Sequence, residues 1–186
     1  MRVIAGSARR LQLKCIDGLE TRPTTDRIKE TLFNIINDDL PGATFIDLFA
    51  GSGGIGIEAL SRGAARCIFV EKNKRAVACI KENLAHTHFE DKGRVIFGDA
   101  VSAVDRLGEY EHLDIIYIDP PYKSDLYGRV LERLALLSNV DEDTLIIIEA
   151  DKYFDFDFES NMDYTTLRVK DYKNNKHIFV RRNIVR

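Results

Sequence analysis

The chain has 186 residues with a net charge of -3, and 45% of its residues are hydrophobic. This composition is typical of a soluble protein with one buried core, so we expect a single domain over residues 1–186. No apolar run approaches the roughly 18 residues of a membrane helix, and Val3-Ile4-Ala5 before Arg9 does not resemble a signal peptide. We therefore expect a cytoplasmic protein with no membrane partner.

The cysteines and histidines do not form a metal-binding pattern. Cys15, Cys67 and Cys79 are widely spaced and odd in number, and no histidine stands at a spacing typical of metal ligands. We expect three reduced thiols and no metal site. His86 and His88 are expected to be surface residues near a helix end.

The N-terminal region predicts a hairpin followed by a helix. Residues 2–5 and 11–15 read as two short strands around a tip at residues 6–10, and we treat residues 1–20 as an extension of a core over 21–186. A helix is expected from about Thr25. Apolar residues recur after it at helical spacing, at Ile28, Leu32, Ile35 and Ile36.

A glycine-rich turn follows the first buried strand. Phe45-Ile46-Asp47-Leu48-Phe49-Ala50 runs into Gly51-Ser52-Gly53-Gly54, and a helix over Ile55 to Leu60 comes next. Glycines let the backbone approach a ligand closely, and a helix N-terminus offers unpaired N–H groups. The turn lacks the Gly-Lys-Ser/Thr of a phosphate-binding loop and fits the dinucleotide fingerprint only loosely. It therefore does not identify its ligand alone.

The next two predicted strands also lead into acids. Residues 68–71 end at Glu71, about 20 residues after the glycines, where an acid can bind both hydroxyls of a ribose. Residues 94–97 lead into Gly98-Asp99. Because the carboxyl ends of parallel strands share one edge of a sheet, these acids and the glycine turn predict a ligand site at that edge.

The fourth predicted strand carries the most informative motif. Ile115-Ile116-Tyr117-Ile118 is followed by Asp119-Pro120-Pro121-Tyr122. Prolines donate no hydrogen bond and hold the chain extended, so the carboxylate and the carbonyls can act as acceptors. Acceptors beside an aromatic ring suit a planar amine such as a nucleobase. By itself the motif is equally compatible with a proline turn in which Asp119 is a cap and Tyr122 packs locally.

The remaining elements predict an α/β fold with one doubly wound sheet. A helix is expected over Leu126 to Leu137 and a strand over 145–148. Alternation of strands and helices implies parallel pairing with helical crossovers. Residues 164–169 and 177–182 flank a polar turn and predict an antiparallel C-terminal hairpin.

This series of strand ends resembles the S-adenosylmethionine-dependent methyltransferases that act on amino groups. The resemblance implies a Rossmann-like class I methyltransferase fold with a seven-stranded, mostly parallel sheet. It also implies that the glycine turn binds the methionine part of the cofactor, the second acid its ribose and the third acid its adenine. The implied cofactor-binding residues are Asp47, Phe49, Gly51, Ser52, Gly53, Glu71, Asp99, Ala100 and Asp119. The implied catalytic residues, which would hold the target amine, are Asp119, Pro120 and Tyr122.

A closer resemblance, covering nearly the whole chain, is to the bacterial RsmD family. It is carried by residues 21–33, which include the distinctive Arg22-Pro23-Thr24-Thr25-Asp26-Arg27, by residues 1–6 and by residues 58–63. Members of that family methylate the exocyclic N2 of one guanine in 16S ribosomal RNA. The resemblance implies 16S rRNA as partner, within a small ribosomal subunit or an assembly intermediate.

The distribution of charge is compatible with an RNA substrate. Residues 1–36 carry +3 and residues 166–186 carry +6, which leaves -12 on the residues between them. Arg9, Arg10 and Lys14 are candidates for phosphate contacts from the hairpin. Three further candidates for the cleft between cofactor and RNA are Arg22, Thr24 and Arg27. Alternatively, Arg22 and Arg27 pair with nearby acids such as Glu30.

A mechanism follows from the low nucleophilicity of guanine N2, whose lone pair is delocalised into the ring. Acceptors at Asp119 and at the Pro120 carbonyl would bind its N–H groups and aim the lone pair at the methyl group. Tyr122 would stack on the displaced base.

Two other functions remain open at this stage. The Asp119–Tyr122 motif suits any nucleobase amine, so the chain could be a DNA adenine-N6 methyltransferase, although the loops are too short for the usual recognition insert. It could also be a non-catalytic ribosome-assembly factor, although the motif and the glycine turn are both intact. A methyltransferase acting on glutamine side chains would more typically have Asn in place of Asp119.

Overall fold

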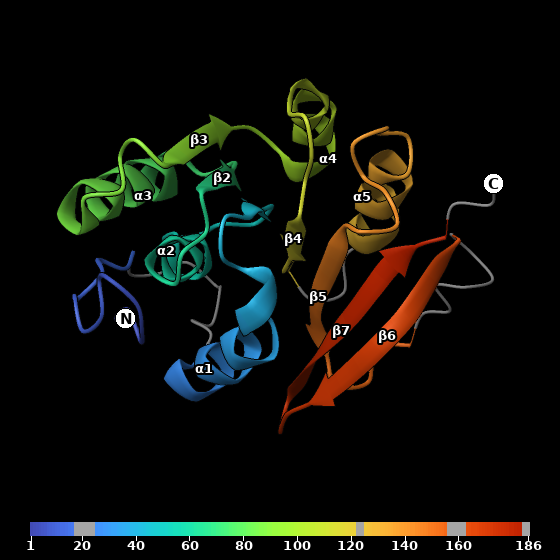
Figure 1. Ribbon diagram of the computed structural model, residues 1–186, viewed down its shortest axis with the longest axis horizontal. Helices are drawn as coiled ribbons and strands as arrows, with labels where there is room; N and C mark the ends of the chain where they lie inside the picture. The colour runs from blue at the N-terminus through green and yellow to red at the C-terminus, as the bar shows by residue number, and fades with distance from the viewer. Residues whose placement is uncertain (17–24, 122–124, 156–162, 184–186) are drawn as a thin grey trace.

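The computed structural model describes residues 1–16, 25–121, 125–155 and 163–183 and has a seven-stranded sheet at its centre (Figure 1). The strand order is β3-β2-β1-β4-β5-β7-β6. The strands are β1 Thr44–Asp47, β2 Arg66–Glu71, β3 Gly93–Phe97, β4 Ile115–Ile118, β5 Leu145–Asp151, β6 Tyr164–Asp171 and β7 Asn175–Arg182. Strands β1 to β5 pair in parallel, and β7 is antiparallel to both β5 and β6. The predicted mostly parallel sheet with an antiparallel C-terminal hairpin is confirmed.

Helices cover both faces of the sheet. On one face lie α1 Asp26–Ile35, α2 Gly54–Ser61 and α3 Lys74–Thr87, and on the other α4 Ala100–Ala103 and α5 Leu126–Leu134. The short 3-10 helices are η1 Asn37–Asp39 and η2 Val104–Glu109. This arrangement is the one that alternating strands and helices predict, because each crossover places a helix on a face of the sheet.

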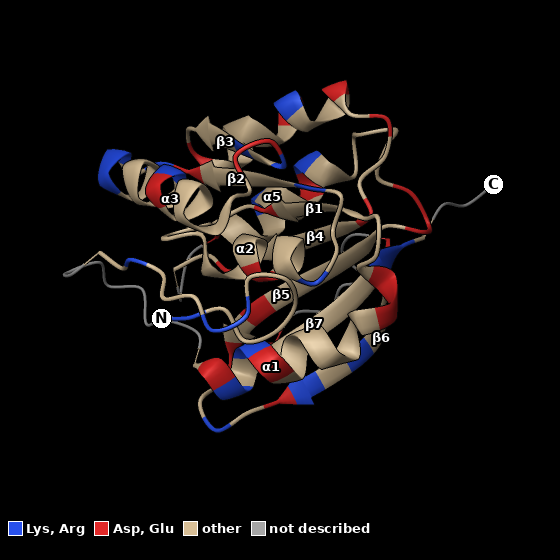
Figure 2. Cartoon of the chain, turned by 60° about the vertical axis from the view of Figure 1, so that its left-hand side comes forward, with Lys and Arg blue, Asp and Glu red and all other residues tan. Residues whose placement is uncertain are grey.

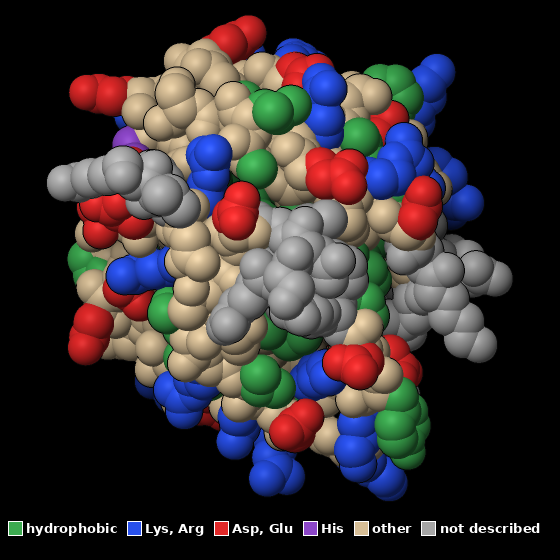
Figure 3. Space-filling view, turned by 90° about the vertical axis from the view of Figure 1, so that its right-hand side faces the viewer, with side chains coloured by type: hydrophobic (Ala, Val, Ile, Leu, Met, Phe, Trp, Pro, Cys, Tyr) green, Lys and Arg blue, Asp and Glu red, His purple; other side chains and the backbone are tan. Residues whose placement is uncertain are grey.

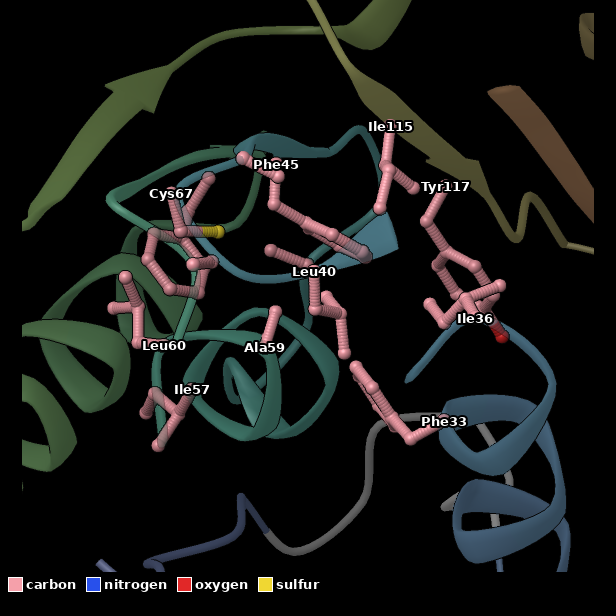
Figure 4. Packing of buried hydrophobic residues seen from close by; sticks show 14 of the residues in the cluster. Phe33, Ile36, Leu40, Phe45, Ile57, Ala59, Leu60, Cys67, Ile115 and Tyr117 are labelled. Carbon is pink, nitrogen blue, oxygen red and sulfur yellow. The ribbon is translucent and has the colours of Figure 1, made fainter. Parts of the chain in front are cut away.

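The core consists of two layers, one on each side of the sheet. Phe45 and Tyr117 point toward α1 and α2, where Phe33 of α1 stacks on Phe45 with ring centroids 6.3 Å apart (Figure 4). Ile46 and Ile116 point the other way and pack with α4 and α5. Since successive side chains of a strand face opposite ways, a central strand such as β4 must be apolar at every position.

The predicted N-terminal hairpin forms, but as one antiparallel bridge between Arg2 and Gln12 instead of two strands. Val3 N–H donates to the Leu11 carbonyl at 3.0 Å, next to that bridge. The pairing stops there because Ile4 N–H and the following N–H groups bond to α2 instead of to the opposite arm.

Two predicted helix boundaries are also revised. The predicted helix over 126–137 is shorter, because after Leu134 the chain passes into tight turns, with N–H bonds from Leu136 and Leu137 reaching back three residues. Thr25, placed in the first helix by the sequence, is its N-cap, and its hydroxyl accepts from Ile28 N–H at 3.4 Å. Within the described part of the chain, no helix has the length and apolar character needed to cross a bilayer.

Candidate active site at the carboxyl edge of the sheet

Asp47 anchors the glycine turn from inside the protein. It is the last residue of β1 and is buried, and its carboxylate accepts from Gly56 N–H at 3.2 Å. Burial raises the pKa of Asp47 from 3.8 to about 7, against the lowering effect of that N–H group. Asp47 therefore shapes the turn from beneath.

Glu71 holds the same turn from the neighbouring strand. Its two carboxylate oxygens accept from Gly51 N–H and from Asn73 N–H, each at 2.8 Å. Gly51 and Gly53 have φ angles of +54° and +84°, a conformation for which glycine is suited. No atom lies within 4 Å of the position a Gly51 Cβ would take, so the turn presents open backbone. The glycine turn and Glu71 were predicted to lie at the same edge of the sheet, and the hydrogen bond between Gly51 and Glu71 confirms that they do.

Asp99 lies at the end of the third strand and caps a helix. Its carboxylate accepts from Ser102 N–H at 3.1 Å and from the Ser102 hydroxyl at 2.9 Å, and these bonds lower the pKa of Asp99. The side chain is exposed and Ala100 behind it is buried. Phe97, also exposed, lies just before them with Lys74 Nζ 5.8 Å from its ring centroid. Asp99 thus has a structural role, and adenine binding there stays a prediction.

Asp119 follows β4, and the charges of two other acids act on it. Loss of hydration raises the pKa of Asp119 well above its usual range, and the charges of Glu149 and Asp47 add to the effect. Pro120 beside it is buried. Tyr122, the third residue predicted to hold the amine, lies outside the described residues, so its stacking role stays a prediction.

Glu149, on β5, is the site residue that sequence reasoning missed. Only 4% of it is exposed, and its side chain accepts from donors on β4 and β7. The sequence feature that could have identified Glu149 is its place directly after the apolar run Leu145–Ile148, because Asp47, Glu71 and Asp119 also end or follow apolar strands.

The described parts of the three segments that carried the closer resemblance meet around Glu58. Glu58 of α2 is fully buried, and its carboxylate accepts from Ile4 N–H at 2.8 Å and Ala5 N–H at 3.0 Å. Lys29 Nζ of α1 lies 3.2 Å away and Arg62 Nε 2.8 Å away. Figure 2 shows the N-terminal segment beside α1 and α2. These residues therefore dock the N-terminal segment, a structural role that the sequence left unassigned.

Asn83 of α3 connects that segment to the glycine turn. Its side-chain amide donates to the Lys14 carbonyl at 3.0 Å and to the Ser52 carbonyl at 2.9 Å, and its oxygen accepts from Lys14 N–H at 2.8 Å. Met1 also packs here, because a Cβ on Gly54 would lie 2.3 Å from its sulfur. The N-terminal segment is thus part of the wall behind the turn.

The candidate RNA-binding residues lie in different surroundings. Arg9 and Arg10 are exposed and line a surface pocket of about 330 Å³ with Arg2, Asp26 and Glu30. Lys14 is exposed and its Nζ lies 2.6 Å from Glu82 on α3.

Arg27 is exposed, and no ion pair joins it to another described residue. Arg22 and Thr24 lie outside the described residues. In Figure 3, Lys and Arg side chains gather along the lower edge of the face over the β6–β7 hairpin.

The cysteines and histidines form no metal centre in the described part of the chain, where no group of three or more His, Cys, Asp or Glu side chains could hold an ion. Cys67 and Cys79 are buried, Cys15 is exposed, and all three are free thiols.

The comparison with known families decides the identity of this site. A family model described as "Conserved hypothetical protein 95" matches residues 1–181. The chain belongs to that family, which is the RsmD family of the sequence resemblance.

Its relatives carry methyltransferase names. The Bacillus subtilis protein named "Putative rRNA methyltransferase YlbH" is 40% identical over 153 residues, which cover 82% of this chain and 83% of that protein. The Escherichia coli "Ribosomal RNA small subunit methyltransferase D" is 34% identical over 151 residues, covering 81% and 75%. The solved structure titled "Putative methyltransferase yhhF from Escherichia coli" has a TM-score of 0.80 and 29% identity, covering 98% of each chain.

This member of the family is a methyltransferase with a class I fold, and its methyl donor is S-adenosylmethionine. The residues present fit that cofactor, since the turn presents open backbone at Gly51 and the oxygens of Glu71 keep lone pairs for ribose hydroxyls. An acidic edge also suits a cationic sulfonium.

Proposed function

We propose that the protein methylates the exocyclic N2 of one guanine in 16S ribosomal RNA, as a cytoplasmic enzyme acting on a small ribosomal subunit or an assembly intermediate. The observation that supports this most is the position of Asp119. It stands at the carboxyl end of β4, beside the strand ends that hold the glycine turn, and is followed by two prolines. The relatives' names and the family support ribosomal RNA as the substrate.

The proposed roles within the cofactor site follow the strand ends. The backbone of Gly51, Ser52 and Gly53 and the side chain of Glu71 would hold the cofactor, with Asp47 fixing the turn from below. Asp99 and Ala100 would border the adenine. S-adenosylmethionine supplies an electrophilic methyl group when bound.

Asp119 and Pro120 would hold the amine as acceptors. The Asp119 carboxylate takes one N–H of the amine and the Pro120 carbonyl the other, which aims the nitrogen lone pair for in-line attack. During transfer, positive charge moves onto the nitrogen, and an ionised Asp119 stabilises that charge. Asp119 need not be a strong base, because the methylated ammonium product loses its proton readily.

We propose that residues 1–20 form an N-terminal extension of a single domain whose catalytic core is residues 21–186, and that residues 1–16 of this extension face the RNA. Arg9 and Arg10 border the pocket beside α1 with Arg2, and their guanidinium groups suit phosphate oxygens. The buried Glu58 contacts hold this segment at a fixed place relative to the glycine turn. A rigid basic rim would select RNA by its shape more than by its sequence.

A methyl-transfer assay with labelled S-adenosylmethionine tests this function. The substrates are small ribosomal subunits that lack the modification, naked 16S rRNA and duplex DNA, and the modified nucleosides are identified by mass spectrometry. We expect N2-methylguanosine from a ribosomal substrate and no product from DNA. N6-methyladenine in DNA would contradict the proposal, and cofactor binding without any transfer would indicate a non-catalytic factor.

A further inference from the structure

A row of polar side chains crosses the sheet behind the candidate active site. In the parallel pairing of β4 with β5, Tyr117 pairs with Ile147 and Ile118 with Ile148, which makes Asp119 and Glu149 the next positions along the two strands. On the other side of β5, Glu149 pairs with His177 of β7. Because side chains alternate along strands, Asp119, Glu149 and Tyr117 belong to the same face of the sheet.

Glu149 is held by donors from two neighbouring strands. The Tyr117 hydroxyl donates to its Oε2, and His177 Nε2 donates to the same oxygen at 3.1 Å. Asn175 Nδ2 donates to Oε1 at 2.6 Å. Burial would raise the pKa of Glu149, but the hydrogen bond and the charge of His177 and the hydrogen bonds from Tyr117 and Asn175 outweigh burial and lower it.

The histidine in this row connects Glu149 to the end of the hairpin. Its Nδ1 lies 3.1 Å from the Tyr172 hydroxyl oxygen, and its Nε2 lies 3.1 Å from Glu149 Oε2. The row of polar contacts from Tyr172 through His177 therefore ends on the Glu149 carboxylate, where Tyr117 and Asn175 also donate.

We propose that Glu149 is a positioning residue for Asp119, which keeps a fixed negative charge behind the amine-binding carboxyl and thereby sets the pH at which the site can accept an amine. This inference rests on the proposed function of Asp119. Two carboxyls at neighbouring positions of adjacent strands do not both ionise at their ordinary pKa, and the donors favour Glu149 as the ionised member. An ionised Glu149 in turn contributes to the raised pKa of Asp119.

The groups facing Asp119 come from three strands. They are Asp47 from β1, Tyr117 from β4 and Glu149 from β5, with His177 and Tyr172 behind Glu149. Tyr117 is held in its neutral form, since burial and then the charge of Glu149 raise its pKa well above 10.0. The charges that act on Asp119 are those of Glu149 and Asp47, and both contribute a negative potential at the proposed amine position. That potential favours transfer of positive charge from sulfur to nitrogen.

The first test of this inference is an NMR titration of Asp119, which does not depend on catalytic activity. The carboxyl carbon of Asp119, labelled with carbon-13 and assigned by its loss in Asp119→Asn, is titrated by NMR in the free protein. In Glu149→Gln we expect its midpoint to move at least about one unit toward lower pH, because the fixed negative charge is gone. Glu58→Gln, the same substitution at the other buried glutamate, should leave the midpoint in place.

The second readout is methyl transfer to 16S rRNA across pH. In Glu149→Gln the acid limb of kcat/KM should move in the same direction as the NMR midpoint, and kcat should fall about tenfold, less than loss of a direct contact. If Glu149→Gln does not fold, Tyr117→Phe replaces it. That variant lacks one donor to Glu149 and should move the midpoint the same way by a smaller amount.

An unchanged Asp119 midpoint in Glu149→Gln, or in Tyr117→Phe when the first variant fails to fold, overturns the inference. A midpoint that moves while the wild type transfers no methyl group to RNA leaves the electrostatic role intact and contradicts the proposed function. The two failures are therefore separable.

Discussion

Two clusters of carboxylates in this protein, one around Glu58 and one at the carboxyl edge of the sheet, differ in the charges that surround them. Around Glu58, two cations and two backbone N–H groups face one carboxylate. At the carboxyl edge of the sheet, the charges of Glu149 and Asp47 both act on Asp119, and both are negative. The first cluster is built for stability, and the second keeps a potential that suits a cationic ligand and a reaction that moves positive charge.

The largest effect is expected from Asp119→Ala. Loss of the acceptor for the amine should reduce methyl transfer to 16S rRNA about a thousandfold. The dissociation constant for S-adenosylmethionine should stay within about threefold, because Glu71 and the glycine turn are untouched. Single-turnover transfer and calorimetry measure the two quantities, and retained activity would remove Asp119 from the mechanism.

Glu58→Ala should produce the largest loss of stability. It leaves Lys29 without its buried partner and two backbone N–H groups without an acceptor, so the free energy of unfolding should fall by about 3–5 kcal/mol. Denaturant unfolding measures this. Asp38→Ala, at an exposed acid of η1, is the control and should change stability by less than about 0.5 kcal/mol. A loss of similar size in both variants would contradict the assigned role.

Asp47 should make the protein less stable as the pH rises. Its pKa is raised from 3.8 to about 7, so its contribution to stability is fully present below pH 3.8 and is lost as pH rises through about 7. The unfolding free energy of wild type relative to Asp47→Asn should therefore fall across that window, by about 4 kcal/mol at most. Thermal and denaturant unfolding across that window check this. A constant difference between the two proteins would show that Asp47 is already ionised.

Glu71→Ala should weaken binding of S-adenosylmethionine. Hydrogen bonds to a charged group are worth about 1.5–3 kcal/mol, which corresponds to a roughly 10-fold to 150-fold rise in the dissociation constant. Calorimetry measures the affinity, with Glu90→Ala at an exposed position after α3 as the control. An unchanged dissociation constant would remove Glu71 from the cofactor site.

The smallest effects are expected at the N-terminal rim. Arg9→Ala and Arg10→Gly should each weaken RNA binding and reduce its salt dependence by about one phosphate contact. Glycine is chosen at position 10 because Arg10 has a φ of +72°, which glycine adopts without strain. Arg66→Ala, at the amino end of β2, is the control. Equal losses in all three variants would indicate a nonspecific charge effect.

The sequence was sufficient for the sheet but not for the polar contacts behind it. Apolar runs that end in Asp47, Glu71 and Asp119 predicted the strands and the edge where these residues meet, because parallel strands align their carboxyl ends. Glu149 and His177 are 28 residues apart and meet only through the antiparallel register of β5 with β7. That register depends on packing and was not readable from local pattern.

The N-terminal segment shows a second feature that could not be predicted from the sequence. Residues 2–5 and 11–15 predicted a two-stranded hairpin, but buried acceptors on Glu58 and Ser61 compete for its N–H groups and shorten it. The acceptors lie more than 50 residues away in the chain. The sequence resemblance pointed to the segments involved without revealing that they touch.

The measurement that tests the contrast between the two clusters most directly is the unfolding free energy of Asp119→Asn beside that of Glu58→Gln, at about pH 8. Each variant replaces a carboxylate by an amide of the same shape. Our account predicts that Asp119→Asn is as stable as the wild type or more stable, because a repelled charge is removed, and that Glu58→Gln is clearly less stable. Comparable destabilisation by both substitutions would contradict the account, because it would mean that the acids at the sheet edge are compensated like Glu58.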